Sequence, residues 1–387
     1  INLMLCTLLY KRLLNLTEFV KLGFSYRSIY GNVVRGWIGH KLVIFLIDAQ
    51  DVEVILNSHV HIKKATDYQM FRPWLGDGLL ISSGEKWRSH RKIIAPTFHI
   101  NILKSFIDVF NENSKRVIEK IRAESGKEFD VHDYMSEATV DILLETAMGT
   151  TKTSHGEKKR LAFLDLLIES AQNGTANITD HDIKEEVDTI MFEGHDTTAA
   201  GSSFVLCLLG VYQGIQAKVH DELNEIFGNS DRPATFLDTL HMKYLERVIL
   251  ETLRLYPPVP IIARELTEDV KIVTNDYLLP AGATVVISPM GIHRNSKYYK
   301  EPDVFNPDNF LPENSAARHY YTFIPFSAGP RSCVGRKYAF LKLKVLLSTI
   351  LREFRVISDV SEEDFILKAD IILKRADGFR IRLEPRK

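Results

Sequence analysis

The ten residues Phe326 to Gly335, FSAGPRSCVG, decide the fold of this chain and point to its chemistry. They hold one cysteine between two glycines, with an arginine two places before the cysteine, and a pattern typical of an amphipathic helix follows directly. Glycine lets backbone approach a flat ligand where a Cβ would clash, and it adopts the positive φ angles that such an approach needs. The segment therefore suits a single thiolate that faces a large cofactor.

Cys333 is the residue of this segment that can bind a metal. We expect it to lie at the N-terminus of the following helix, where the aligned peptide dipoles carry about half a positive charge. That charge favours thiolate over thiol and lowers the pKa of the cysteine, and a bound metal would complete the deprotonation. The competing interpretation is an ordinary loop cysteine, because a lone buried cysteine is usually inert.

The pattern F-x-x-G-x-R-x-C-x-G resembles the haem-binding loop of the cytochromes P-450, the haem-thiolate monooxygenases. The resemblance implies the fold of that family, mainly α with small β-sheets, over a single domain that spans residues 1–387. It implies haem b, iron protoporphyrin IX, as the cofactor, with Cys333 as the proximal ligand of the iron. The motif residues that it assigns to cofactor binding are Phe326, Gly329, Arg331, Cys333 and Gly335.

A second segment, DIKEEVDTIMFEGHDTTAAG (182–201), combines a helical pattern with residues that a buried helix avoids. Its apolar residues recur at helical spacing, and Thr179 is the predicted N-cap. Midway, residues 193–198 place a glycine, two acids and two hydroxyls where a core helix should be apolar. Such a glycine costs up to about 1 kcal/mol, and hydroxyls compete for backbone carbonyls. A functional role would explain that cost; the alternative is a polar stripe on a surface helix.

This stretch is similar to the central oxygen-activating helix of the cytochromes P-450, whose pattern is A/G-G-x-D/E-T-T/S. Glu193 occupies the first position, and an acid there resembles family 4, the fatty-acid ω-hydroxylase group, in an insect-like form. In that group this glutamate can form an ester to a haem methyl, so the resemblance implies Glu193 as a candidate covalent anchor. It also implies Asp196 and Thr197 as the relay that brings protons to dioxygen inside a dry pocket.

Glu251 and Arg254 place opposite charges at i and i+3 on one helical face, a pair worth about 0.2 to 0.5 kcal/mol when exposed. With the following LYPPVP they look like the E-x-x-R-x-x-P-P segment that braces the cysteine loop in the family. There an arginine from a P-E-R-F motif joins the pair. Here the sequence is PDNF, and Asn309 has no guanidinium, so we expect the third member of the brace to be weakened or replaced.

Haem carries two carboxylates, so a haem site needs cations. Trp87 and Arg91 match the W-x-x-x-R pattern of the family, and Arg264 and Arg331 fit the remaining positions. The planar fork of arginine suits pairing with carboxylates. Each residue taken alone also fits a surface charge or a core aromatic, so only their joint occurrence favours the haem site.

A cluster of basic residues suggests where a redox partner docks. We predict a basic proximal surface for an acidic reductase, although solvated lysines would give the same pattern. The residues of this predicted surface are Lys86, Arg88, His90, Lys92, Lys337, Lys342 and Lys344.

The composition sets the class of partner. Lysine and arginine number 49 against 50 acidic residues, and the net charge of -1 gives no bulk reason to expect nucleic-acid binding. Three cysteines without disulfide spacing suit a reducing compartment. The opening INLMLCTLLY is about half the roughly 20 residues that span a bilayer. Because the chain begins with isoleucine, we expect its true N-terminus and any anchor to lie upstream, and residues 1–15 match the family poorly.

Hydrophobic periodicity predicts a mostly helical chain. Residues 33–47 are predicted as a hairpin. Helices are predicted over 52–57, 102–121, 134–148, 158–170, 182–209, 215–227, 242–255 and 336–354, and strands over 270–273, 284–288 and 379–383.

One segment of the family pattern is missing. Between Gly149 and Lys158 the chain has eight residues, 150–157, where the family carries two helices that form the roof of the substrate pocket. Eight residues make about 12 Å of helix, which is one short piece at most. The fold is therefore expected to be incomplete at this point.

The leading functional hypothesis is a monooxygenase that inserts one oxygen atom of dioxygen into a C–H bond of an apolar substrate, such as a fatty acid, another lipid or a xenobiotic. Thiolate ligation favours O–O cleavage. The resemblance implies NADPH–cytochrome P-450 reductase as the electron donor, cytochrome b5 as a further partner, and the cytosolic face of the endoplasmic reticulum membrane as the location. Two alternatives stay open: a haem-binding but uncoupled or inactive splice form or fragment, and a haem-free helical interaction domain.

Overall fold

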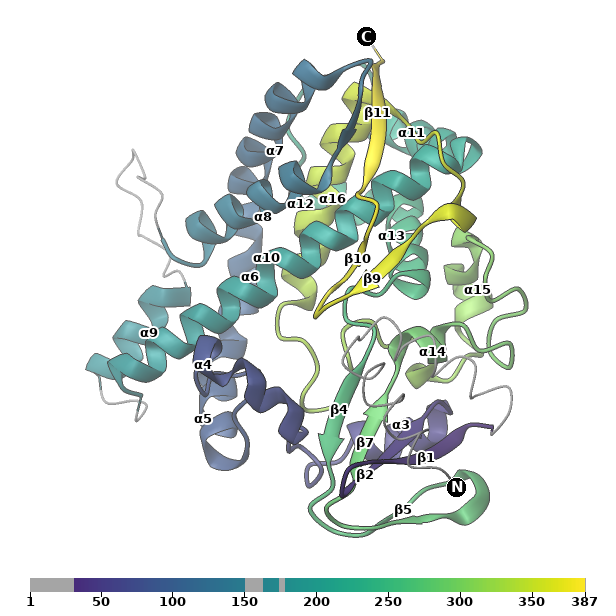
Figure 1. The fold of residues 1–387 in the computed structure, drawn as a ribbon. Coiled ribbons are helices and arrows are strands. Elements are labelled where there is room, and N and C mark those ends of the chain that lie inside the picture. The colour runs from purple at the N-terminus through teal and green to yellow at the C-terminus, as the bar shows by residue number, and fades with distance from the viewer. Residues whose placement is uncertain (1–30, 150–162, 174–177, 387) are drawn as a thin grey trace.

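The structure is a computed structural model that describes residues 31–149, 163–173 and 178–386. Its described part is mainly α with small β-sheets, as the sequence predicted (Figure 1). Predictions that concern residues 1–15 and the short connection at 150–157 lie outside the described residues.

Nine helices of eight or more residues occur in the described ranges. They are α3 (Ala49–Leu56), α5 (Gly84–Ile94), α7 (Ile107–Ile121), α8 (His132–Thr146), α9 (Phe163–Gln172), α10 (Asp180–Val211), α11 (Gln213–Phe227), α13 (Lys243–Leu255) and α16 (Arg336–Glu353). Shorter helices are α4 (Arg72–Leu75), α6 (Ile100–Leu103), α12 (Phe236–His241), α14 (Pro289–His293) and α15 (Pro312–Ser315).

The strands form four small sheets. One has the order β1-β2-β7-β4, with β1 (Val33–Ile38), β2 (Lys41–Leu46), β7 (Thr284–Ile287) and β4 (Ile262–Glu265). Another has the order β3-β11-β8, with β3 (Glu128–Asp130), β11 (Arg380–Pro385) and β8 (Phe354–Ile357). The remaining two are the pairs β9 (Leu367–Ala369) with β10 (Leu373–Arg375), and β5 (Val270–Lys271) with β6 (Leu278–Leu279).

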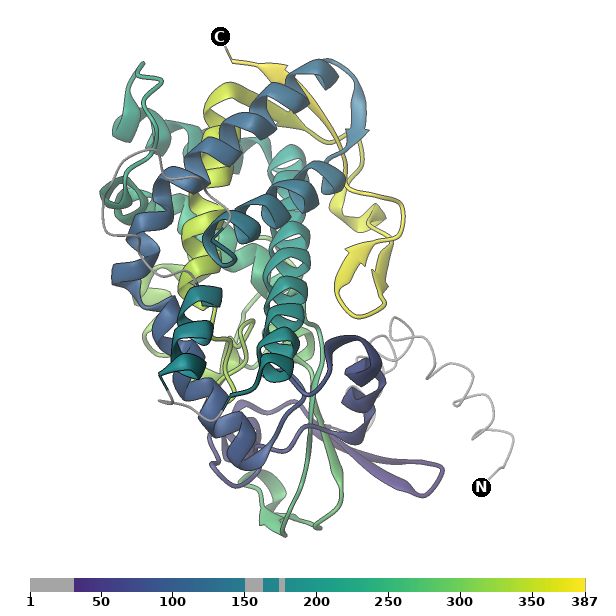
Figure 2. The same cartoon turned by 90° about the vertical axis from the view of Figure 1, so that its left-hand side faces the viewer.

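Helix α10 runs through the middle of the molecule; α8 and α16 lie beside it, and α7 packs against α8 and α16 (Figures 1 and 2). It begins with a capping box in which the Thr179 hydroxyl and the Asp182 carboxylate each bind the other residue's backbone N–H. A Cβ added to Gly194 would lie 2.9 Å from the side chain of Leu143 on α8. Glycine at this position therefore permits the close approach of α8 and α10.

The four-stranded sheet connects two distant parts of the sequence. β2 pairs in parallel with β7, and β7 pairs with β4 in a register that sets Arg264 opposite Val285. Its buried side chains form a second hydrophobic cluster beside the larger helical one. This register sets Arg264 beside Lys64 and Arg331, which lie near Glu193 in the middle part of α10.

Several sequence predictions are confirmed and others are wrong. The hairpin, the capping residue Thr179 and the extent of α10 are as expected. The helix predicted over 102–121 is divided, because a short 3-10 turn at 104–106 separates α6 from α7. α5 and β4, which carry the predicted haem cations, were missed because short elements give little periodicity.

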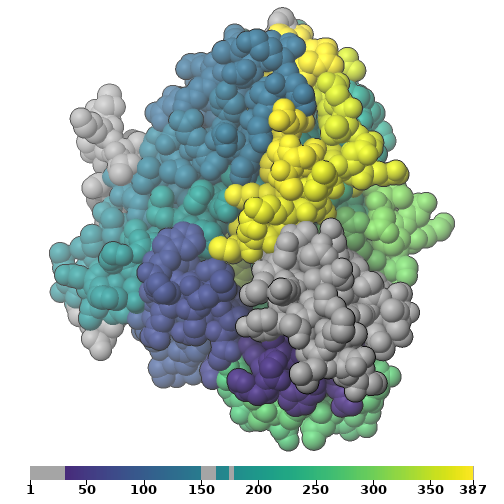
Figure 3. All heavy atoms as spheres, viewed as in Figure 1, coloured from purple at the N-terminus to yellow at the C-terminus, as the bar shows by residue number. Residues whose placement is uncertain are grey.

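The C-terminal strands lie against the helices on the face seen in Figure 3. No single helix in the described ranges is long and apolar enough to cross a bilayer, and two bent pairs of helices meet the length and composition criteria only jointly.

Candidate functional site

The cysteine loop is held in shape by one glycine and one backbone hydrogen bond. The N–H of Cys333 donates to the carbonyl of Phe326 at 2.9 Å, which closes the loop. Gly329 has φ +69°, and a Cβ there would lie 1.9 Å from the carbonyl oxygen of Leu56. Only glycine therefore lets this loop lie against the end of α3.

The predicted position and pKa of Cys333 are wrong. Helix α16 begins at Arg336 with Gly335 as its N-cap, so the cysteine lies two residues before the cap. Burial is the largest influence on the thiol, followed by the nearby carboxyl of Glu193, and together they raise its pKa to about 11. The surroundings of the thiol thus do not favour the thiolate by themselves, whereas a bound metal would.

The thiol of Cys333 is accessible. The side chain of Cys333 is exposed, yet protein surrounds it closely enough to raise its pKa through burial. A Cβ added to Gly335 would meet only the sulfur and the ring of Phe98, both at 3.9 Å. The ring of Phe326 packs against Phe340 with 5.5 Å between centroids. The glycine thus places no side chain of its own against the sulfur.

Four cations gather around Glu193 and the cysteine loop. Three were predicted: Arg91 on α5, the buried Arg264 on β4, and the buried Arg331 in the cysteine loop. Lys64, which sequence reasoning missed, pairs through its backbone with Arg264 and has its ammonium 4.6 Å from the Tyr68 ring. None of the three arginines is in an ion pair within the described ranges.

The charges of this cluster oppose one another. Burial, then repulsion from Arg264, lower the pKa of Arg331 to about 9. Burial, Arg264 and Arg331 hold the pKa of Lys64 well below its usual value. Glu193 on α10 is the acid that counteracts these shifts, and burial raises the pKa of that carboxyl. Four cations with one carboxyl suit an anionic occupant, so the residues present fit haem and its two propionates.

Trp87 and Arg331 support one another. The guanidinium lies 4.7 Å from the indole ring and donates to the carbonyls of Ser82 at 2.7 Å and Leu80 at 3.0 Å. The indole itself is buried. This stack fixes the direction of the arginine, and Arg91 lies one turn further along the helix that holds the tryptophan.

The polar residues of α10 bond to their own helix and to a neighbouring strand. The Thr197 hydroxyl donates to the Glu193 carbonyl at 2.7 Å, and the Thr198 hydroxyl donates to the Gly194 carbonyl at 3.2 Å. Asp196 forms an ion pair with Lys374 on β10 at 2.6 Å. Thr197 and Asp196 are therefore adjacent in sequence but bonded to different groups.

The brace predicted around Glu251 and Arg254 has a new third member. Both side chains are fully buried, with two hydrogen bonds of 2.8 Å between them. The Asn309 amide donates to Glu251 at 3.0 Å, and the Asn306 N–H donates to the same oxygen at 2.8 Å. Asparagine thus takes the place in the brace where the family has arginine.

The predicted basic surface is wrong for most of its members. Lys342 and Lys344 are buried in α16, and His90 is buried against Glu186 at 2.7 Å. Lys86 pairs with Asp182 and Glu185 at 2.7 and 2.9 Å. The sequence prediction failed for the lysines of α16 because the hydrophobic periodicity of a helix does not distinguish a buried lysine from an exposed one. The members that stay exposed are Arg88, Lys92 and Lys337.

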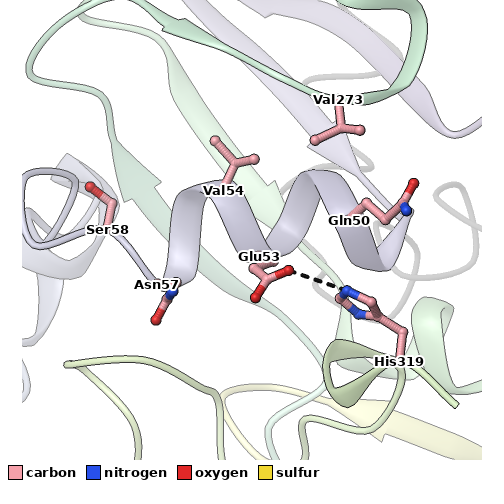
Figure 4. Close-up of a pocket in the computed structure, with 7 residues that line it drawn as sticks. All are labelled: Gln50, Glu53, Val54, Asn57, Ser58, Val273 and His319. Carbon is pink, nitrogen blue, oxygen red and sulfur yellow. Dashed lines mark ion pairs between the residues drawn. The ribbon is translucent and has the colours of Figure 1, made fainter. Parts of the chain in front are cut away.

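An open pocket of about 430 Å³ lies elsewhere, beside α3 (Figure 4). Glu53 and His319 form an ion pair of 3.2 Å across it. Its lining contains none of the predicted site residues: Gln50, Glu53, Val54, Asn57, Ser58, Val273 and His319.

Comparison with known proteins gives two kinds of match. The sequence model of the cytochrome P450 family matches residues 3–161 and 150–382. Cytochrome P450 4g15 of Drosophila melanogaster is 49% identical, over 92% of this chain and 86% of that protein. Cytochrome P450 4g1 of the same organism is 45% identical over 95% and 85%, and human cytochrome P450 4V2 is 35% identical over 95% and 86%.

The extent of these alignments is informative about the short connection that follows Gly149. The two segments of the family match meet at residues 150–161. The alignment with cytochrome P450 4g15 extends over 495 positions, which is 108 more than the 387 residues of the chain. At least that many aligned positions of the relative therefore have no counterpart here.

Proposed function

This chain belongs to the cytochrome P450 family, with relatives of family 4, and from that premise we propose how its residues serve a haem-thiolate monooxygenase. Such an enzyme binds haem and inserts one atom of dioxygen into a C–H bond, and it receives electrons from a redox partner. We propose Cys333 as the iron ligand. The observation that supports this assignment is the group of four cations around Glu193 and the cysteine loop, of which Arg91 also acts on the exposed thiol.

Arg91, Arg264, Arg331 and Lys64 would hold the haem propionates. Lys64 and Arg331 would lose the repulsion that now lowers their pKa values, because two carboxylates balance the excess of positive charge. We propose haem b as the form bound here, because it carries two propionates for the cations and its iron can bind a single protein thiolate. When bound, haem supplies the activation of dioxygen. The protein has to position the substrate, exclude water and deliver protons.

Asp196 and Thr197 are proposed to deliver those protons. Asp196 meets Lys374, which is about one-third exposed, so this carboxylate can exchange protons at the outer side of α10. The Thr197 hydroxyl, which donates to the Glu193 carbonyl, can turn to donate into the cofactor space instead. A hydroxyl beside an acid can thus pass protons through a dry site.

Replacing Thr197 by alanine should leave haem bound but raise the share of electrons released as hydrogen peroxide, by about 10-fold or more. The measurement is peroxide and product formed per NADPH consumed. Ser202→Ala is the matched control, because its hydroxyl also bonds only to carbonyls of α10, at 2.9 and 3.0 Å, one turn further on. Equal coupling in the Thr197 variant and the parent would remove Thr197 from the relay.

We propose that Glu193 carries an ester to a haem methyl. The carboxyl lies among Lys64, Arg331 and Arg91, which favour its charged form against the effect of burial. Glu193→Gln should make all of the haem extractable by acidic organic solvent, while the parent retains it. Glu186→Gln is the control, since that carboxyl lies on the same helix but bonds to His90 and to the N–H of Leu79. Complete extraction from the parent would rule out the ester.

The substrate is proposed to be apolar, with a fatty acid or another lipid first and a xenobiotic second. Phe192, which precedes Glu193 on α10, packs against Trp74 of α4 with 4.6 Å between ring centroids. Leu75 and Ile81 complete this small cluster. Apolar side chains next to the proposed haem anchor suit a hydrocarbon chain better than a polar substrate.

NADPH–cytochrome P-450 reductase is the proposed electron donor, with cytochrome b5 as a second partner. Arg88, Lys92 and Lys337 keep their exposure and could steer an acidic protein to this side. Membrane association on the cytosolic face of the endoplasmic reticulum is proposed by analogy with the family.

An alternative form of this proposal is a chain that binds haem but is uncoupled. It is supported by the break in the family match at residues 150–161 and by the 108 surplus positions in the alignment. Loss of two roof helices there would leave the distal side less able to exclude water. Product per NADPH, measured with purified reductase, separates the two: hydroxylated product near stoichiometric yield supports the monooxygenase, and peroxide alone supports the uncoupled form.

A further inference from the structure

A lysine lies in the helical core and forms no ion pair with any residue that the structure describes. Lys342 on α16 is fully buried. Its ammonium lies 5.1 Å from the Tyr338 ring, one turn earlier on the same helix. A buried ammonium that lacks a partner is costly, and proteins rarely keep one without a use. Lys342 is not among the residues proposed to bind haem or to deliver protons.

The acceptor of Lys342 is on the oxygen-activating helix. Its Nζ donates to the carbonyl of Gly194 on α10 at 2.8 Å, and this carbonyl also accepts from the Thr198 hydroxyl. Gly194 directly follows Glu193. The bond therefore links the helix that continues the cysteine loop to the helix segment that carries the proposed haem anchor and relay.

The neighbouring carbonyls of α10 are held in the same way. The Glu193 carbonyl accepts from Thr197, and the His195 carbonyl accepts from Thr139 of α8 at 3.2 Å. Three consecutive carbonyls, 193 to 195, thus each accept a side-chain hydroxyl or ammonium. Two of these donors come from other helices. Side-chain bonds of this kind compete with the helical ladder and set the local course of the backbone.

We propose that Lys342 is a positioning residue for the monooxygenase reaction: through the Gly194 carbonyl it fixes the backbone that aims Glu193 and Thr197 at the cofactor space. This inference rests on the proposed function. Lys342 would act through its hydrogen bond to α10.

The charge of Lys342 makes this role dependent on pH. Burial lowers the pKa of Lys342 to about 7, and no charged side chain of the described helices contributes to that shift. The phenol of Tyr338, hydrogen-bonded to Thr146 at 2.8 Å, is the titratable group that faces it. Below neutrality the charged ammonium bonds more strongly to a carbonyl than the neutral amine does above it. Coupling of electrons to product should therefore fall as the pH rises through about 7.

The test compares the haem-loaded parent with Lys342→Met, Lys342→Gln and a control, Lys344→Met. Lys344 is the next lysine on α16; it is also buried, but it bonds to Thr239 and Glu246 and not to α10. Lys342→Met should raise the ratio of peroxide to product about threefold to tenfold, where tenfold corresponds to about 1.4 kcal/mol, on the order of one hydrogen bond. It should also remove the fall of coupling near pH 7. Lys342→Gln, which keeps an N–H donor, should restore part of the coupling without that pH dependence.

A second readout does not depend on activity. A lysine with a pKa of about 7 when folded and near 10.4 when unfolded binds fewer protons in the folded state between these values, so parent stability should rise with pH there. Lys342→Met should lack this slope in guanidinium unfolding curves, and Lys344→Met should keep it. Coupling in Lys342→Met that matches Lys344→Met at every pH overturns the inference while the proposed function stands. A parent without the haem-thiolate carbonyl band contradicts both.

Discussion

Cys333→Ser is expected to abolish the red-shifted Soret band of the reduced carbonyl complex and to lower product formation by more than about 100-fold, which exceeds the usual loss when a residue that only supports a metal ligand is changed. A thiolate donates electron density that favours O–O cleavage, and a serine hydroxyl does not replace it. The side chain is exposed, so the stability of the haem-free chain should change by less than about 0.5 kcal/mol. The measurements are the carbonyl difference spectrum and the denaturant midpoint.

Cys207→Ser is the control for that change. This cysteine is fully buried in α10, and burial raises the pKa of its thiol to about 12. Serine there should cost about 1 kcal/mol or more of stability but leave the carbonyl band in place. An unchanged band in Cys333→Ser would defeat the assignment of the iron ligand.

Arg254→Met should be the most destabilising of the substitutions considered, at about 3 to 5 kcal/mol. It removes the partner of Glu251 and leaves that fully buried carboxylate without its guanidinium. It also frees the carbonyls of His293 and Val304, to which Arg254 donates at 3.0 Å. Guanidinium unfolding of the haem-loaded chain measures the loss.

Arg247→Met provides the matched comparison on the same helix. Arg247 pairs with Asp308 at 3.0 Å, and the aspartate is about half exposed, so the loss should stay below about 1 kcal/mol. The difference between the two variants reports the desolvation of the buried pair. Similar losses in both would mean that the Glu251–Arg254 pair is not the structural brace.

The brace also shows where sequence reasoning reached its limit. The charge pair at i and i+3 could be located from four letters, but its energy could not, because the same spacing is worth a few tenths of a kcal/mol on a surface and several when buried. The replacement of the family arginine by Asn309 was recognised as a departure. The hydrogen bond from its amide to Glu251 depends on η6 (Pro307–Phe310), a turn that brings Asn309 to a residue 58 positions earlier in the sequence.

The candidate site likewise contains residues that the sequence identified and one, Lys64, that it did not. The residues of the cysteine loop could be identified together because they all lie within ten consecutive positions. Over so short a segment the backbone can adopt few conformations. Lys64 could not, since a lysine beside another lysine in HIKKATDY is typical of a solvated surface. Its inward position follows from the backbone bridge to Arg264, 200 residues later.

The sequence by itself determined the family, the mainly helical class and the short motifs, because these depend on local spacing and hydrophobic period. Only the tertiary structure decided which charges are buried. Burial raises the pKa of Cys333 instead of lowering it, and it turns Lys342 from a presumed surface lysine into a core residue. Desolvation of a charge depends on packing against helices that are far apart in the chain, so no local sequence pattern reveals it.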